Sequence, residues 1–423
     1  MTGERQVKGP RQVFSGVRAL RSPAFRALFT AQVVSVVGTW SQNLATTLLV
    51  LHLTGSAAAL GTVTAAQTVP ILLLAPVTGR VIDRANVRML LIATGSAAAA
   101  TAFTVSALAA TGHAPVWALT VAAALFGTAS AFDRPGQYAL LPAVVDDEAR
   151  PSAISLTTTA AAAGRLGGPA LAALIYGTAG PAACFAFNGA SYLAVVGALV
   201  VLPRFAREGG FAGRRKRKDE PADNGDAEGI GLRYAWRNPD LRAALLVNTL
   251  IGCLSFNFGL MLAAMVTFTY KGGSSLVGLA YTTDAVGAVL GGVLGVGAAL
   301  LTRRRLALAC AALGLTICAA GAAPDLVVFF AVLPVMGVAI SAYQTSVTAL
   351  VQKVAAPHML GRAMSLLTLG WFGTTPLGAL LAGWVADVWS ARATMGMAGA
   401  ASLLGALALL WRPARGAVSH PRG

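Results

Sequence analysis

The sequence is poor in charged residues, which occupy 11% of its 423 positions, while hydrophobic residues occupy 56%. A soluble domain carries about 25% charged residues, so this chain lacks the polar surface needed to face water on all sides. Its apolar runs are long enough for membrane spans, which need about 20 apolar residues each. The composition therefore excludes a soluble globular domain and predicts a multi-pass protein of a lipid bilayer.

Acidic residues are also scarce: 16 Asp and Glu stand against 32 Lys and Arg, for a net charge of +16. In a soluble chain this excess would raise the question of nucleic-acid binding. Here the basic residues gather in alternate loops, as in Arg80 to Arg88 and Arg303 to Arg305, whereas the intervening loops carry only Lys271 and Arg392. This asymmetry follows the positive-inside rule. It predicts cytoplasmic termini and a charge that reflects topology, with no nucleic-acid partner.

Cysteines and enzyme motifs are rare or missing as well. The four cysteines all fall in apolar spans and show no Cys-x-x-Cys spacing, so we expect small buried hydrophobic residues. The sequence contains no Gly-x-x-x-x-Gly-Lys-Ser/Thr loop, no cluster with metal-ligand spacing and no legible nucleophile–base pair. We therefore expect no enzyme activity, no cofactor, no metal and no ATP coupling. Residues 1–24 are polar and basic, which argues against a cleavable signal peptide.

The apolar segments predict twelve transmembrane helices. They lie near 27–51, 59–79, 89–110, 116–143, 154–178, 182–202, 241–268, 277–301, 306–322, 326–351, 365–386 and 393–411. The longest polar stretch divides them into two sets of six. The predicted organisation is a cytoplasmic N-terminal segment 1–26, an N-terminal six-helix bundle 27–202, a cytoplasmic central linker 203–240, a C-terminal six-helix bundle 241–411 and a cytoplasmic tail 412–423.

The two sets of six spans have similar short sequences at corresponding positions. The run Ser22–Ala27 before the first span resembles Asn238–Ala243 before the seventh, and Leu60-Gly61 resembles Val277-Gly278 at nearly the same offset. Parallel repeats of this kind place a substrate cavity near the bilayer midplane, open alternately to each side. The predicted fold class is an all-α membrane protein with twelve transmembrane helices in two pseudo-symmetric six-helix bundles.

The turn Gly79–Arg88 has the pattern Gly-x-x-x-Asp-Arg-x-x-x-Arg and is too charged to lie in hydrocarbon. With this turn, the runs Gly38–Ala45, Ala131–Pro135 and Gly361–Leu366 make the chain similar to the major facilitator superfamily of transporters. Within it, the chain most resembles the branch that includes the bacterial enterobactin exporter and macrolide efflux proteins. The resemblance covers nearly the whole chain, and it implies the major facilitator fold.

The resemblance implies that Gly79, Asp83, Arg84 and Arg88 form a cytoplasmic gate motif, which latches helix ends while the cavity faces outward. An acid such as Asp83 can cap a helix N-terminus and pair with a neighbouring arginine. The corresponding turn of the second half, Arg303 to Arg305, has no acid in that place, so we expect the two cytoplasmic gates to differ. The alternative is that the charged turn only fixes topology.

Gly164, Gly168 and Pro169 resemble the motif that the superfamily's antiporters carry in their fifth helix. Small residues allow close helix approach, and proline lets a helix bend. Two glycines that are usual in that motif are replaced by Ala172 and Ala173. Ordinary tight packing is therefore an alternative to a role in antiport.

Asp133, Arg165 and Asp284 are ionisable residues within spans, and such residues are costly in hydrocarbon. Asp133 and Arg165 each lie about eleven residues from the cytoplasmic ends of adjacent spans, roughly 16–18 Å deep. An ion pair between them is expected, with Arg134 as a competing partner. It is either a permanent stabilising pair or a site whose proton and partner exchange during transport. Asp284 is either a proton or cation site or a hydrated acid near the outer mouth.

Polar and aromatic side chains in the spans are candidates for the lining of the substrate cavity. They are Trp40, Gln42, Asn43, Gln67, Asn257, Tyr343, Gln344 and Trp371. Together such groups suit a bulky apolar substrate with a few polar handles. Any single amide is expected to join helices more often than to bind a ligand.

The sequence thus predicts a secondary active transporter of the inner membrane, monomeric, that exports a small amphiphilic drug, antibiotic, natural product or siderophore. Export would be coupled to protons, as in an efflux antiporter of multidrug resistance, and would proceed by alternating access. One alternative is a solute importer or facilitator on the same fold. Another is a membrane receptor or scaffold that does not transport and acts through the central linker.

Overall fold

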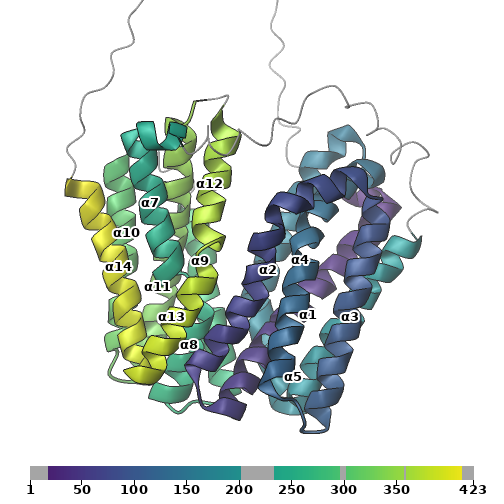
Figure 1. The fold of residues 1–423 in the computed structure, drawn as a ribbon, viewed down its shortest axis with the longest axis horizontal. Coiled ribbons are helices and arrows are strands. Elements are labelled where there is room, and N and C mark those ends of the chain that lie inside the picture. Colours follow the sequence, from purple (N-terminus) through teal and green to yellow (C-terminus); the bar gives the residue numbers. More distant parts are fainter. Residues whose placement is uncertain (1–17, 202–232, 296–301, 357–358, 412–423) are drawn as a thin grey trace, which may run out of the picture. The chain divides into compact units, whose positions relative to one another are not determined.

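The computed structural model describes residues 18–201, 233–295, 302–356 and 359–411, and within these ranges the chain is helical (Figure 1). Eleven helical segments among the described residues are long and apolar enough to cross a membrane. Two of them end at a glycine turn. Gly55 and Gly112, which follow two of the helices, have positive φ angles of 62° and 71°, a conformation that glycine adopts easily.

The first half of the chain forms five long helices after a short 3-10 helix, η1. Their bounds are η1 Arg18–Arg21, α1 Pro23–Thr54, α2 Ala57–Arg84, α3 Val87–Ala110, α4 Val116–Val144 and α5 Arg150–Val201, with a 3-10 turn η2 at Asp147–Ala149. Within α5, Gly180 has non-helical angles (φ 79°, ψ 179°) and precedes Pro181, which cannot donate a backbone hydrogen bond. The two arms of α5 therefore correspond to the fifth and sixth predicted spans.

The second half contains two discontinuous spans. Its elements are α7 Pro239–Leu254, α8 Phe258–Ala264, the π-helix η5 Met265–Thr269, α9 Ser274–Gly295, α10 Arg303–Ala322, α11 Leu326–Val354, α12 Leu360–Phe372, α13 Thr375–Val388 and α14 Ala391–Trp411. The seventh predicted span is built from α7, α8 and η5, and the eleventh from α12 and α13. The prediction of an all-α membrane fold is confirmed.

The chain divides into two compact units, each held together by its own internal packing. Unit 1 consists of Met1–Asn43, Leu73–Ala114 and Leu125–Pro221, and unit 2 of Leu44–Leu72, Pro115–Ala124 and Ala222–Gly423. Helices α1, α2 and α4 are therefore each divided between the two units. The division into bundles 27–202 and 241–411 stays a prediction.

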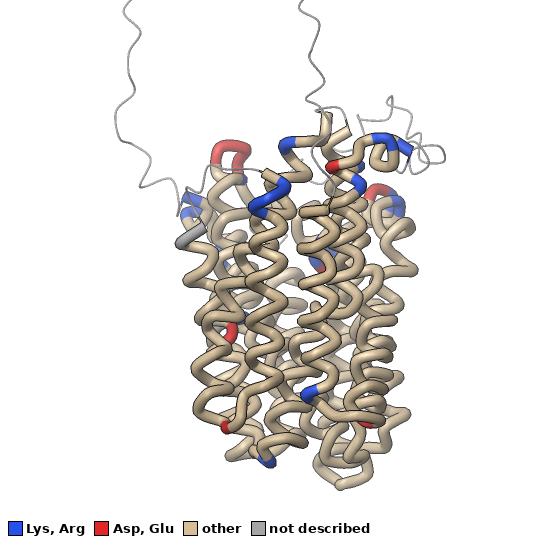
Figure 2. Tube along the Cα trace, turned by 90° about the vertical axis from the view of Figure 1, so that its left-hand side faces the viewer, with Lys and Arg blue, Asp and Glu red and all other residues tan. Residues whose placement is uncertain are grey.

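Large apolar side chains cover the outside of the helices. Among the most exposed are Leu73, Trp117, Val293, Val327 and Trp411. Charged residues gather toward helix ends, and the long middle stretches carry few of them (Figure 2). Extensive exposed apolar surface of this kind is covered by lipid in a membrane protein.

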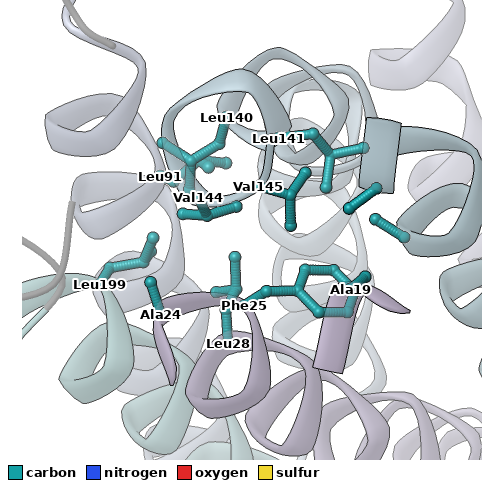
Figure 3. Packing of buried hydrophobic residues seen from close by; sticks show 12 residues of the cluster. Ala19, Ala24, Phe25, Leu28, Leu91, Leu140, Leu141, Val144, Val145 and Leu199 are labelled. Atoms are coloured by element: carbon teal, nitrogen blue, oxygen red, sulfur yellow. The ribbon is translucent and has the colours of Figure 1, made fainter. Parts of the chain in front are cut away.

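One end of unit 1 is packed by an apolar cluster (Figure 3). Phe25 and Leu28, near the start of α1, are buried together with Leu140 and Val144 near the end of α4 and with Leu91 of α3. The cluster fixes the start of α1 against α3 and α4. These three helices go on to line the cavity described below.

In unit 2, α9 and α11 approach each other through glycines. A Cβ on Gly287 would lie 2.6 Å from the Cα of Pro334, and a Cβ on Gly291 would lie 2.7 Å from the Cα of Val338. Small residues at a crossing let two membrane helices approach backbone to backbone. Helices α9 and α11 therefore pack closely next to Asp284, which lies one turn before Gly287 on α9.

The two halves repeat a capping pattern at their first helices. The Ser22 hydroxyl accepts a hydrogen bond from the N–H of Phe25 at 3.3 Å, before α1. The Asn238 side chain accepts from the N–H groups of Asp240 and Leu241, both at 3.2 Å, before α7. Ser and Asn are favoured at this position because they satisfy amides that have no partner within the helix.

A second repeat joins arginines to the ends of distant helices. Arg88, at the start of α3, donates to the carbonyl oxygens of Leu199 (2.7 Å) and Val200 (3.1 Å) at the end of α5. Arg303, at the start of α10, donates to the carbonyl oxygen of Ala408 (3.2 Å) near the end of α14. The last carbonyls of a helix lack helical partners and favour a cation. The matching contacts support the predicted duplication.

Candidate functional site

A polar cavity lies inside unit 1, around Asp133 of α4. It has a volume of about 30 Å³, which is room for one or two water molecules. Helices α1, α3, α4 and α5 all contribute to its wall. Its polar lining consists of Gln32, Ser35, Thr94, Ser130, Asp133, Gln137 and Tyr192. The cavity thus combines one carboxylate with neutral hydrogen-bonding groups.

Asp133 is half-buried, and its nearest partner is on its own helix. The side-chain Nε2 of Gln137, one turn further along α4, donates to the Asp133 Oδ1 at 2.7 Å. Arg134 is the next residue on α4, and it is exposed. Arg165 is half-buried on α5 but does not line the cavity, and its pairing with Asp133 stays a prediction.

Helix α1 packs against the glycines of the fifth-helix motif. A Cβ on Gly168 would lie 2.6 Å from the Cβ of Trp40, and a Cβ on Gly164 would overlap the side chain of Val36. Gly164 and Gly168 are one turn apart, as are Val36 and Trp40, so the two helices fit along a ridge. Trp40 therefore packs against these glycines, and Pro169 lies within α5, next to Gly168. A role of the motif in antiport stays a prediction.

Gln42 also links α1 to α5 inside unit 1. Its Oε1 accepts a hydrogen bond from the Nδ2 of Asn188 at 2.6 Å, and both residues are buried. A Cβ on Gly38 would lie 2.7 Å from the Oδ1 of Asn188, so the Asn188 side chain packs directly against the backbone of Gly38. This arrangement joins helices, which is the role expected for most single amides.

The residues of the predicted gate motif fall on two helices. Gly79, Asp83 and Arg84 lie in the last two turns of α2; Asp83 and Arg84 are exposed. Arg88 lies in the first turn of α3 and donates to the end of α5, as described above. The cap of α3 is Asn86, whose side chain accepts from the N–H of Met89 at 3.3 Å. A Cβ placed on Gly79 would meet no atom of the described residues within 4 Å.

In unit 2 the two discontinuous spans meet at their breaks. A Cβ on Gly252, near the end of α7, would lie 2.6 Å from the carbonyl oxygen of Gly370 in α12. A Cβ on Gly378, at the start of α13, would overlap the carbonyl oxygen of Cys253. Substrate and ion sites of transporters are typically built where such helices are interrupted. The crossing is therefore the second candidate site.

Aromatic rings surround this crossing. The ring centroids of Phe256 and Trp371 are 5.2 Å apart, and those of Phe256 and Phe258 are 5.4 Å apart. Between the two phenylalanines, Asn257 donates from Nδ2 to the carbonyl oxygen of Cys253 at 3.2 Å. The Trp371 Nε1 is buried and has no hydrogen-bond partner among the residues that the structure describes.

Tyr343 is part of a buried network beside this crossing. Its hydroxyl donates to the Oδ1 of Asn248 at 3.1 Å, and the Nδ2 of Asn248 donates to the carbonyl oxygen of Leu367 at 2.9 Å. Both side chains are fully buried. The network joins α11, α7 and α12, so Tyr343 joins helices in this structure.

The other predicted residues have fewer described contacts. Asp284 is buried on α9, and a Cβ on Gly337 of α11 would overlap its carbonyl oxygen. Asn43, Gln67 and Gln344 lie on α1, α2 and α11. The described part of the chain holds no group of three or more side chains suited to a metal ion.

Sequence reasoning missed the surroundings of Asp133. Gln137 could have been found, because residues four apart share one face of a helix. Tyr192 and Gln32 come from other helices, and no local pattern indicates that they share a cavity.

The fold is that of major facilitator superfamily transporters. The nucleoside transporter NupG matches with a TM-score of 0.71 at 13% identity, over 92% of this chain and 98% of that one. A bacterial homologue of the iron transporter ferroportin, in an inward-facing state, matches with a TM-score of 0.70 at 17% identity, over 92% and 98%. A bacterial homologue of the lysosomal transporter Spinster, inward-facing and occupied, matches with a TM-score of 0.68 at 14% identity, over 93% and 97%.

Residues 14–417 match the family described as transmembrane secretion effectors, and the chain belongs to this family. Macrolide efflux protein A of Streptococcus pyogenes is 24% identical over 371 residues, which cover 86% of this chain and 89% of that protein. The chain is therefore a multi-pass membrane transporter for a small molecule and not an enzyme.

Proposed function

We propose that this transporter is a proton-coupled exporter of a small amphiphilic molecule in the cell membrane. The observation that carries the proposal is the carboxylate of Asp133 in a polar cavity with room for water. A charge that is partly shielded from water is costly, and taking up a proton removes that cost. Asp133 can thus couple proton entry to a change in the packing of α1, α3, α4 and α5 around the cavity.

The efflux relative supports the direction of transport and the substrate class. Macrolides are large molecules with extensive apolar surface and scattered oxygen acceptors. The crossing of α7/α8 with α12/α13 offers apolar contact from Phe256 and Trp371 and hydrogen-bond donors from Asn257 and the Trp371 indole. We infer that this crossing supplies part of the substrate site, since interrupted helices are the usual place for one.

The exposed gate motif fits the same cycle. Asp83 and Arg84 lie at the end of α2 that the positive-inside rule places in the cytoplasm. Among the described residues, none lies within 4 Å of a Cβ placed on Gly79, so another helix end can approach this turn in the proposed cycle. In the proposed cycle the turn closes while the cavity faces outward and opens when the cavity faces the cytoplasm. The monomeric state and cytoplasmic termini belong to the same proposal.

A susceptibility assay tests the export function. The wild-type chain and the Asp133→Asn variant are expressed in a bacterial host that lacks its own efflux pumps, and growth is measured against a panel that includes a macrolide. We expect the wild type to raise the inhibitory concentration of at least one compound about fourfold or more, and Asp133→Asn to abolish the increase.

Asp147→Asn is the matched control for Asp133→Asn. Asp147 is an exposed acid near the end of α4 that pairs with Arg150 at 2.5 Å, so its loss should leave export intact. If cells expressing the wild type instead accumulate the compounds and become more sensitive, the chain is an importer. Equal protection by Asp133→Asn and the wild type would remove Asp133 from the coupling mechanism.

A further inference from the structure

The first turn of α2 is capped by a carboxylate from the second half of the chain. Asp387 lies at the end of α13. Its Oδ1 accepts a hydrogen bond from the N–H of Ala57 at 2.6 Å, and its Oδ2 accepts from the N–H of Ala58 at 3.0 Å. The hydroxyl of Ser56 also donates to Oδ2, at 2.5 Å. All four residues belong to unit 2.

The start of α2 depends on this contact. The first four N–H groups of a helix have no partner within the helix. Ser56 accepts from the N–H of Ala59 at 3.1 Å, so Ser56 satisfies one of these groups and Asp387 satisfies two more. A carboxylate at a helix N-terminus is also favoured by the helix dipole. Asp387 therefore acts as a capping residue for a helix that lies 329 to 331 positions away in sequence.

Next to the cap, α2 and α13 touch backbone to backbone. A Cβ on Gly383 would lie 2.5 Å from the carbonyl oxygen of Ala57 and 2.9 Å from the Cα of Ala58. A Cβ on Gly61 would overlap the carbonyl oxygen of Ala379. Each helix thus presents a glycine to the backbone of the other. The contact is built for close approach, and its polar cap lies at one end of it.

Helix α2 carries this cap at its start and the Gly79–Arg88 turn at its other end. Its 28 residues put the two features about 40 Å apart, at the opposite faces of a membrane. The start of α2 belongs to unit 2, whereas its end, Leu73–Arg84, belongs to unit 1. A transporter with two repeats must open at one face while it stays closed at the other. The cap is therefore placed to control the face opposite the Gly79–Arg88 turn.

We propose that Asp387, Ser56 and the first turn of α2 form an outer clasp that holds the outward gate of the transporter closed. Opening to the outside breaks the three hydrogen bonds to the Asp387 carboxylate together. The clasp is therefore either closed or open. Asp387 is a positioning residue in this scheme and touches no substrate. The proposal needs only that the chain is a transporter of this fold, and it is independent of proton coupling, substrate and transport direction.

Distances between spin labels at Leu53 and Trp389 report on the clasp. Both side chains are exposed, at 45% and 71%, and they flank Ser56 and Asp387 in sequence. The labels are attached to cysteines in a background whose four native cysteines are replaced by alanine, and the protein is measured in lipid nanodiscs. In the otherwise unmodified protein we expect one dominant short distance, because the clasp is closed.

Asp387→Asn should move the distribution toward a longer distance. The amide offers one acceptor oxygen, and its NH2 group faces the N–H donors of α2. Losing one of these solvent-exposed bonds should raise the ratio of open to closed states about threefold to tenfold. Ser56→Ala keeps both backbone bonds to Asp387, so it should give a smaller shift in the same direction. If Asp387→Asn does not fold, Ser56→Ala alone carries the test.

Asp325→Asn is the matched control. Asp325 caps α11 by accepting from the N–H of Val328 at 2.9 Å within its own helix, and asparagine caps a helix as well as aspartate does. This variant should leave the distribution between Leu53 and Trp389 unchanged. The proposal is overturned if Asp387→Asn and Ser56→Ala leave the distances unchanged, or if Asp325→Asn shifts them as far.

Discussion

The side chains of Gln137 and Asp133 are joined by a hydrogen bond of 2.7 Å across one turn of α4, at the wall of the polar cavity in unit 1. The amide is a neutral donor, so it holds the carboxylate in place and adds no charge to the cavity. Gln137 thus orients the group to which we assign the proton. Replacing Gln137 therefore tests the role of this hydrogen bond while Asp133 stays in place.

Gln137→Leu should impair transport driven by a pH gradient about fivefold to tenfold. Without the donor, the half-buried Asp133 carboxylate loses a hydrogen bond worth roughly 1–1.5 kcal/mol. Transport of a macrolide by reconstituted protein measures the effect. Tyr138→Phe changes the next residue, whose side chain is exposed, and should leave transport unchanged. Equal rates for Gln137→Leu and the wild type would mean that the hydrogen bond has no part in coupling.

Gly168→Ala should destabilise the protein by about 1–3 kcal/mol, because the new methyl group overlaps Trp40 in a packed crossing. Gly167→Ala adds the same methyl group where no atom of the described residues lies within 4 Å, so it should be neutral or stabilising. Thermal unfolding of the purified variants in detergent compares the two. The same melting temperature for both variants would contradict the close packing of α1 and α5.

Asn248→Ala should cost about 1–2 kcal/mol of stability, in the range found for buried hydrogen bonds between membrane helices. The change removes the bonds to Leu367 and Tyr343 together. Tyr343→Phe removes one of these two bonds and should cost less. A double-mutant cycle on the unfolding free energy should give a positive coupling between Asn248 and Tyr343. Strict additivity would show that the hydroxyl–amide bond contributes nothing.

Asp83→Asn should reduce transport about tenfold, whereas Arg304→Gln should change it less than twofold. The two residues belong to the corresponding turns of the two halves, but the second turn has no acid. Arg304 is preferred to Arg303 for this comparison, because Arg303 bonds to Ala408 and pairs with Asp240 at 3.5 Å. Expression and membrane insertion are checked by surface labelling. Similar losses in both variants would leave the turn with a topological role alone.

The sequence was sufficient for the spans and for the helix ends that local chemistry controls. The predicted spans 154–178 and 182–202 end and begin within two residues of Gly180, where Gly180 and Pro181 interrupt the helix. The breaks in the seventh and eleventh spans were not predicted. They occur where Gly378 meets the backbone near Cys253, and a contact between distant segments leaves no local signature.

The candidate sites were predictable only in part. A lone acid such as Asp133 in an apolar span stands out because it is costly in hydrocarbon. Tyr192 lines the same cavity, but it could not be predicted from the sequence, because only the packing of α5 beside α4 brings it there. The Ser56–Asp387 contact likewise joins two segments that each resemble an ordinary helix end. Long-range pairs of this kind depend on packing that no single segment encodes.

Proton exchange by the reconstituted transporter tests the central claim most directly. Proteoliposomes are loaded at acid pH with a pH-sensitive dye and diluted into neutral buffer that contains a macrolide. We predict that substrate addition accelerates alkalinisation of the lumen in the wild type and in Asp147→Asn, and that Asp133→Asn abolishes this acceleration. Macrolide uptake without any acceleration, at the same rate in all three proteins, would contradict proton coupling through Asp133.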